Sequence, residues 1–440
     1  MQSESQSKRL LDRVIMLASS GKGMTATAVL RGSDGGNTRF AVNEITSSSD
    51  VERLTLSVNV QFGKRSATAT TNQLDDRSVD DVVGRATRMA KLAPENPEAM
   101  PPLGKQKYMA VNGARDGKTV DLSPKERAKA VGAVISAGDA AKLQIAGFYE
   151  HASEISALAS SAGLWAFHTW TSCGLSCTAR TSDGTGSGWS SASSNRIAEI
   201  DAAALAKVAV DKAISSAKPR RLEPGRYTVV LEPAAVADLT SELASQLGAR
   251  SADEGRSFFS KPGGGTRVGE KLFPETITLK SDPTDTALTA TPFDGEGVPL
   301  APTRWIDKGK VTGLTYGRYW SKKNGVAPTG SPEGWILEGG KATRDELIKG
   351  VKRGVLITRF WYIRSLDPQT ILLTGLTRDG TFLIENGAIV APVMNFRFNE
   401  SPVHMLTKCD ALTPAIIAGG MRVPALRTHD FHLASISEAI

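Results

Sequence analysis

Cysteine is scarce in this chain of 440 residues, which contains three. A secreted domain held together by disulfides needs an even and closely spaced set of cysteines, so this class of protein is excluded. Cys173 and Cys177 lie four positions apart in a strand-like segment. A straight strand would separate them by roughly 13 Å, too far for one zinc ion. We expect both to be small buried residues of a protein from a reducing compartment.

Histidine is nearly as rare, with five in the chain, and neither HExxH nor HExxxH occurs. A zinc peptidase needs two histidines on one helix and a third ligand. His429 and His432 lie three apart, but in a strand-like tail, where we expect surface histidines. The Gly-x-Ser-x-Gly elbow of serine hydrolases is also missing. The glycine cluster at 184–188 lacks the Lys-Ser/Thr step of a phosphate loop and predicts a hairpin turn.

Long apolar runs are missing as well, since no stretch approaches the roughly 18–20 residues of a membrane span. The short apolar patch at 14–18 follows charged residues and indicates an amphipathic helix rather than a signal peptide. The formal charge of +7 comes from basic residues scattered singly or in pairs. A nucleic-acid reader would show a basic stripe, so this pattern argues against nucleic acid as a partner. We expect a cytoplasmic protein without a membrane partner.

The first hundred residues show alternating helix and strand signals. Expected helices are 5–19 and 78–93, and expected strands are 25–31, 38–44, 54–62 and 64–71. The first strand pair flanks an Asp34-Gly35 step, a strong hairpin signal, and Gly63 is expected to turn the second pair. A proline-rich linker at 94–102 closes this unit.

A middle unit begins at Ser123-Pro124-Lys125-Glu126, which has the pattern of a helix capping box. Strand signals follow it, and then an alanine-rich helix at 199–217. Beyond residue 225 strands dominate, apart from a helix expected at 234–247 and a glycine-rich flap at 261–265. We predict an α+β fold, with N-terminal (1–100) and middle (120–218) α/β sandwich-like units and a β-rich C-terminal domain (225–440).

Several segments resemble signatures of the TldD/TldE (PmbA) family of peptidase subunits. In chain order they are 37–45, 67–75, 160–168, 183–189, 290–298, 380–398 and 419–427. The most specific is 290–298, where Pro292-Phe293-Asp294-Gly-Glu296-Gly297 is similar to the family's PFDxEG segment. The resemblance covers nearly the whole chain in the family's order.

The resemblance also identifies a degenerate site. In the catalytic, TldD-like branch of the family, a helix that follows a strand carries HExxxH. The corresponding register here places Ser241 and Gln246 at the two histidine positions and Glu242 at the glutamate position. Serine and glutamine are not competent zinc ligands. The C-terminal cysteine segment of that branch is missing too, so the resemblance implies no catalytic and no metal-binding residue in this chain.

The resemblance therefore implies the TldE/PmbA-like branch, a non-catalytic subunit of a heteromeric zinc metallopeptidase that cleaves small or unfolded peptides. The zinc would reside in a TldD-like partner that carries HExxxH, and a homodimer is one alternative where that partner is absent. Two alternatives stay open. One is a stand-alone hydrolase with Glu242 as its base, and the other is a peptide- or nucleic-acid-associated binding protein without protease activity.

Overall fold

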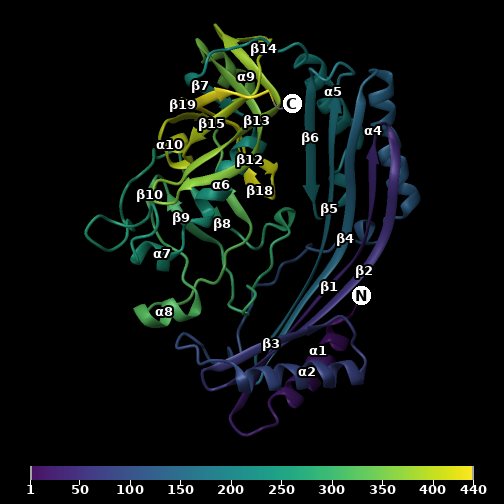
Figure 1. Ribbon diagram of the computed structural model, residues 1–440, viewed down its shortest axis with the longest axis vertical. Helices are drawn as coiled ribbons and strands as arrows, with labels where there is room; N and C mark the ends of the chain where they lie inside the picture. The colour runs from purple at the N-terminus through teal and green to yellow at the C-terminus, as the bar shows by residue number, and fades with distance from the viewer. Residues whose placement is uncertain (1, 439–440) are drawn as a thin grey trace.

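The computed structural model describes residues 2–438 and builds them into β-sheets flanked by helices (Figure 1). A long, curved sheet lies along one side of the molecule and a β-rich C-terminal domain along the other (Figure 1). The predicted α+β fold is confirmed. No helix among residues 2–438 is long and apolar enough to cross a membrane.

The long sheet has six strands in the order β3-β2-β1-β4-β5-β6, and every neighbouring pair is antiparallel. The strands are β1 (Met24–Ala41), β2 (Glu44–Phe62), β3 (Arg65–Thr71), β4 (Gln144–Ser160), β5 (Trp165–Arg180) and β6 (Ser187–Ser194). Strands of the first and the middle unit thus share one sheet, because β1 pairs with β4 from Thr27 to Phe40.

The hairpin expected at Asp34-Gly35 is wrong, because this step lies inside β1 and is paired with β2 and β4 on its two sides. The glycines serve close packing: a Cβ on Gly35 would stand 2.0 Å from the carbonyl oxygen of His151. The chain turns instead at Val42 and Asn43, whose φ angles are 51° and 61°. The hairpin across Gly63 is confirmed.

Helices cover the long sheet on the face opposite the C-terminal domain (Figure 1). They are α1 (Glu4–Ala18), α2 (Asp76–Leu92), α3 (Gly117–Val120), α4 (Pro124–Ala140), η1 (Ile197–Glu199) and α5 (Ala202–Ser215). The predicted capping box of α4 is confirmed, because the Ser123 side chain accepts from the Glu126 backbone N–H and the Glu126 carboxylate accepts from Ser123. Fully buried residues such as Leu11 and Val79 fix these helices on the sheet, at about 1.5–3 kcal/mol for each large aliphatic side chain.

The C-terminal domain contains a second sheet that curls on itself, since β12 pairs with both β7 and β13. Its strands are β7 (Gly225–Leu231), β12 (Arg353–Asp367), β13 (Leu372–Glu385), β14 (Ala388–Pro392), β15 (Phe396–Glu400), β16 (Cys409–Leu412) and β19 (Leu426–Ile436). Strand β13 is continuous but bends at Asp379 and Gly380, whose φ angles are 55° and 129°.

A third, smaller sheet and several short helices complete the domain. The sheet contains β8 (Leu279–Ser281), β9 (Thr303–Asp307), β10 (Lys310–Val311), β11 (Trp335–Leu337), β17 (Ile416–Ala418) and β18 (Met421–Val423). The helices are α6 (Pro233–Ser245), α7 (Ala249–Asp253), η2 (Thr286–Leu288), α8 (Arg318–Asn324), α9 (Arg344–Lys349) and α10 (Pro402–Thr407). One large apolar core joins α6 to both sheets of the domain.

Candidate functional site

Helix α6 follows β7 directly, as the sequence predicts, and the residues expected to form a degenerate motif lie at its C-terminal end. It starts at Pro233, whose missing N–H is tolerated in the first helical turn. Apolar residues such as Val236, Leu239 and Leu243 fix one side of the helix in the core. The side that bears the motif is less buried.

The three motif positions lie at the C-terminal end of α6. Ser241 is exposed and donates to the backbone oxygen of Asp238 (2.9 Å), while Glu242 and Gln246 are partly exposed. The helix ends at Ser245, so Gln246 is its C-cap. These positions offer one hydroxyl, one carboxylate and one amide, whereas a zinc shell needs imidazole, thiolate or several carboxylate donors. The donor set does not fit zinc.

The histidines are placed on elements other than α6. His151 and His168 are buried in β4 and β5, and burial lowers the pKa of His168 to about 4. Nδ1 of His404 lies 3.0 Å from Oε1 of Glu400, and Nε2 of His429 lies 2.8 Å from Oδ2 of Asp410. Within residues 2–438, no group of three or more His, Cys, Asp or Glu side chains is arranged to hold a metal ion.

Cys173 and Cys177 are buried in β5, with exposed fractions of 4% and 1%, so the expectation that they are small buried residues is confirmed. Burial raises the pKa of Cys173 to about 12. A thiol with such a pKa stays protonated at neutral pH and is a poor nucleophile.

Asp238 is an acidic residue of α6 that the sequence reasoning missed. Its Oδ2 accepts from the backbone N–H of Phe360 on β12 (3.2 Å). Burial raises the pKa of Asp238 to about 6, an effect that Arg359 partly offsets. The Arg359 guanidinium also lies 3.4 Å from Asp379 and stacks over the Trp189 ring of β6 at 4.2 Å. Asp238 therefore adjoins a contact between the C-terminal domain and the edge of the long sheet.

The PFDxEG segment forms a loop that docks the C-terminal domain on the long sheet. Phe293 is 2% exposed and packs on Leu158 of β4, with its ring 5.1 Å from that of Tyr108. Asp294 shapes the loop by accepting from the backbone N–H groups of Glu296 and Val298, at 2.9 Å each.

Two further features fix the conformation of the loop. Gly297 has a φ of 85°, which favours glycine, and a Cβ there would stand 2.7 Å from Leu164. Its carbonyl oxygen accepts from the Tyr108 hydroxyl (2.9 Å). Burial raises the pKa of Tyr108 to about 12, so this hydroxyl remains a donor at neutral pH.

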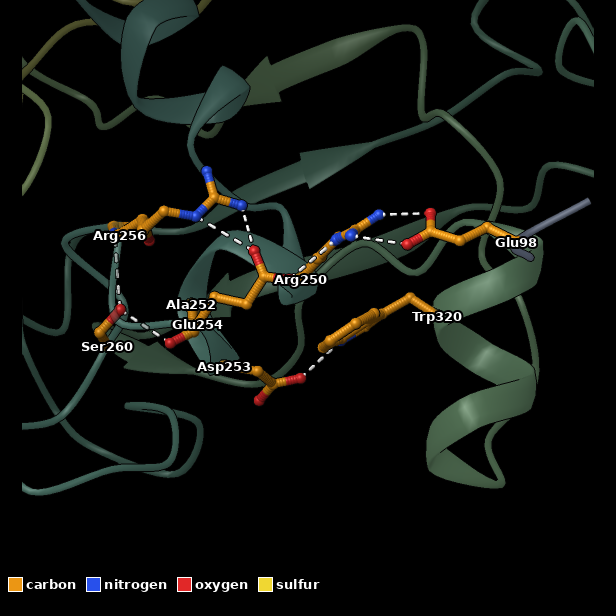
Figure 2. A network of polar contacts seen from close by, with 9 residues as sticks. Glu98, Arg250, Ala252, Asp253, Glu254, Arg256, Ser260 and Trp320 are labelled. Carbon is orange, nitrogen blue, oxygen red and sulfur yellow. Dashed lines mark hydrogen bonds and ion pairs between the residues drawn. The ribbon is translucent and has the colours of Figure 1, made fainter. Parts of the chain in front are cut away.

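The linker after α2 is bound to the C-terminal domain near this loop. Figure 2 shows Arg250 with two hydrogen bonds to Glu98 (2.7 and 2.8 Å) and one to Glu254 (3.0 Å). Beside it the Trp320 indole donates to Asp253 (2.6 Å), and the Arg250 guanidinium lies 5.2 Å from the Trp320 ring centroid (Figure 2).

Between the long sheet and the C-terminal domain lies a cleft of about 590 Å³, which we call the interdomain cleft. Its floor is formed by residues of β1, β2, β4 and β5 and its roof by residues 289–295 with Glu333. The principal floor residues are Arg31, Ser33, Arg53, Thr55, Glu154, Ser156 and Trp170. Ser241, Glu242 and Gln246 do not line this cleft.

The sequence reasoning identified none of these floor residues, although a signal was present. The alternating strand at 54–62 buries Leu56, Val58 and Val60 under the helices, so the residues between them point to the opposite face. Those residues, such as Thr55 and Ser57, are polar, which indicates that this face of the strand is not part of the apolar core. The pattern of this strand cannot predict the roof of the cleft, because the roof is formed by a segment more than two hundred positions further along the chain.

Comparisons with known proteins agree with this architecture. Residues 118–217 match the model of the PmbA/TldA metallopeptidase central domain, and residues 224–435 match that of the PmbA/TldA metallopeptidase C-terminal domain. The chain therefore belongs to the TldD/TldE (PmbA) family.

Two curated relatives show similarity over part of their length. A metalloprotease of Methanothermobacter thermautotrophicus is 27% identical over 162 residues, which are 33% of this chain and 34% of that protein. Metalloprotease PmbA of Escherichia coli O157:H7 is 24% identical over 188 residues, 41% of this chain and 40% of that protein. The matches thus span about a third to two-fifths of these relatives.

Among solved structures, TldE from Thermococcus kodakarensis superposes with a TM-score of 0.86. The likeness covers 97% of this chain and 100% of that one at 20% sequence identity. It shows that the fold is shared over 97% of this chain.

Proposed function

We propose that this chain is the non-catalytic subunit of a heteromeric zinc metallopeptidase of the TldD/TldE type, which cleaves small or unfolded peptides. In this proposal an HExxxH-bearing partner supplies the zinc and the catalytic glutamate. The present chain supplies structure and part of the cavity that holds the peptide. The assembly would be cytoplasmic.

The observation that carries the proposal is the chemistry of α6. The helix follows β7 directly, as the resemblance implies for the metal-binding helix, and the register taken from the resemblance assigns Ser241 and Gln246 to the ligand positions. A neutral hydroxyl and a neutral amide cannot replace two imidazoles around zinc. Family membership together with this donor set supports a subunit that depends on a partner for hydrolysis.

The decisive experiment has two parts, applied to the chain purified alone and co-expressed with an HExxxH-bearing homologue. Elemental analysis should find no stoichiometric zinc in the isolated chain and about one zinc per heteromer in the complex. A peptidase assay on an unfolded peptide should detect chelator-sensitive hydrolysis by the complex alone.

A matched pair of variants distinguishes the catalytic roles of the two subunits. Glu242→Gln in this chain should leave the activity of the complex unchanged, whereas the same substitution at the glutamate of the partner's HExxxH motif should abolish it. Stoichiometric zinc in the isolated chain would overturn the proposal. Chelator-insensitive hydrolysis by the isolated chain that is lost in Glu242→Gln would instead favour the stand-alone hydrolase.

A further inference from the structure

Two arginines without a counter-ion stand at one end of the interdomain cleft. Arg31 of β1 pairs with Thr55 of β2, and Ser33 pairs with Arg53, so the arginines are diagonal neighbours on one face of the sheet. Both side chains are exposed, and neither forms a hydrogen bond or ion pair with another described residue. Arg31 reaches the roof, because a Cβ built on Gly295 would stand 3.5 Å from its Nη2. Guanidinium groups so placed are suited to hold a carboxylate.

The other end of the cleft is acidic. Glu154 of β4 is paired with Ser33 on one side and with Trp170 on the other, so Arg53, Ser33, Glu154 and Trp170 form one row across the sheet. Its Oε1 accepts from the Ser172 hydroxyl (2.7 Å), which orients the carboxylate without neutralising it. Burial, and after it the charge of Glu154, raises the pKa of Glu150, which lies four residues earlier on β4.

The separation of the two ends corresponds to a short peptide. Arg53 on β2 and Glu154 on β4 are two strand spacings apart, roughly 9.5 Å, and Arg31 on β1 lies on the strand between them. An extended peptide advances roughly 3.3–3.6 Å per residue, so the termini of a tripeptide lie at a similar distance. The volume of about 590 Å³ can hold such a ligand, and the Trp170 ring offers it an apolar surface.

We propose that the interdomain cleft binds short peptides with free ends, with the α-carboxylate held by Arg31 and Arg53 and the α-ammonium group held by Glu154. This inference rests on the proposed function only in that peptides are the compounds the assembly handles. It adds a site that recognises both termini of a cleaved fragment, away from α6.

The test is isothermal titration calorimetry of the full-length chain with trialanine, its N-acetylated form and its C-amidated form at low salt. Removing either terminal charge should weaken binding about tenfold, since hydrogen bonds between charged groups contribute more than neutral ones. The double variant Arg31→Gln, Arg53→Gln should lose the preference for the free carboxylate and keep that for the free amine. Glu154→Gln should show the converse.

Arg39→Gln is the matched control, because Arg39 is an exposed arginine on the same strand that does not line the cleft. It should bind all three peptides as the unchanged chain does. Inorganic phosphate serves as a competitor that distinguishes a peptide site from a general anion site. It should compete weakly and show no dependence on Glu154.

Equal affinity for the three peptides, no binding at millimolar concentration, or phosphate binding as tight as that of trialanine would each overturn the inference. The outcome is separable from that of the proposed function. A chain that forms an active heteromer but ignores peptide termini refutes the inference alone. A chain that reads the termini yet holds its own zinc refutes the proposed function alone.

Discussion

Two of the contacts that join the C-terminal domain to the long sheet are built from different forces. At the first, which we call the β6 junction, Ser187 of β6 donates to the buried Asp379 of β13, and Arg359 bridges Asp379 and Trp189. At the second, the loop junction, Phe293 inserts into an apolar cluster while Asp294 binds backbone N–H groups. The first contact is made of charges largely removed from water, and the second mainly of apolar burial.

This difference implies that the two junctions respond to different changes. Buried charges depend on their protonation state and on their partners, so the β6 junction should be sensitive to pH. Apolar contacts depend on shape and volume, so the loop junction should be sensitive to truncation. The interdomain cleft is roofed by residues next to the loop junction and should change with it.

The largest effect is expected from Phe293→Ala at the loop junction. Truncating a fully buried phenylalanine removes its apolar burial and leaves a cavity, which typically costs about 3–5 kcal/mol. Denaturant unfolding should show this loss as a lower midpoint. Peptide binding in the cleft should weaken with it, because the loop carries part of the roof.

Tyr362→Ala is the control, since this aromatic side chain is 59% exposed. Its unfolding free energy should change by less than about 0.5 kcal/mol. If Phe293→Ala were as harmless, the loop would not fasten the C-terminal domain to the sheet.

At the β6 junction, Asp238→Asn should stabilise the protein at pH 8. Burial raises the pKa of Asp238 from its ordinary value of 3.8 to about 6, so ionising it costs the folded state roughly 2–3 kcal/mol above that pH. The sign follows from proton binding: the folded state holds this proton more tightly, so the contribution of Asp238 to stability improves as the pH falls from 7 to 4. Asparagine removes the cost at high pH while its side-chain oxygen can still accept from Phe360.

Chemical denaturation between pH 4 and pH 8 measures this prediction. The difference in unfolding free energy between Asp238→Asn and the unchanged chain should be close to zero at pH 4. It should increase in favour of the variant as the pH rises through about 6. Glu242→Gln, one helical turn further along α6, is the control. If the difference in unfolding free energy for Asp238→Asn did not change with pH, the burial of Asp238 would not affect its ionisation.

The sequence predicts those features that depend on interactions between residues close together in the chain. The α4 capping box and the Gly63 hairpin depend on residues within a few positions, and both are predicted correctly. The helix at α6 is predicted from its spacing, but its end at Ser245 and the burial of Asp238 against β12 come from packing.

The Asp34-Gly35 step shows the limit of local signals. Asp-Gly favours a tight turn, yet here the strand continues because β2 and β4 supply hydrogen bonds on both sides. Glycine is needed for close approach to the His151 backbone, a contact between residues more than a hundred positions apart. The interdomain cleft escaped the sequence reasoning for the same reason, since Arg31, Arg53 and Glu154 meet only through strand pairing.

The smallest effect is expected at the rim of the loop junction, from Arg250→Ala. Exposed ion pairs contribute little to global stability, so the unfolding midpoint should hardly move. The two hydrogen bonds to Glu98 nevertheless hold the linker at residues 94–102 against the C-terminal domain (Figure 2). Losing them should speed amide hydrogen exchange in this linker and trypsin cleavage at Lys105 just beyond it.

Arg256→Ala is the matched control for this local effect. Arg256 hydrogen-bonds Glu254 in the same network but does not touch Glu98 (Figure 2). Faster exchange in the linker for Arg250→Ala alone would assign the effect to the Glu98 contact. Equal exchange in both variants would show that the linker is held by its other contacts, such as the Lys64 ammonium group on the carbonyl oxygens of Pro97 and Ala99. In that case the ion pairs at the rim of the loop junction would not hold the linker independently of the buried centre. The difference between the loop junction and the β6 junction would then depend on Phe293 alone.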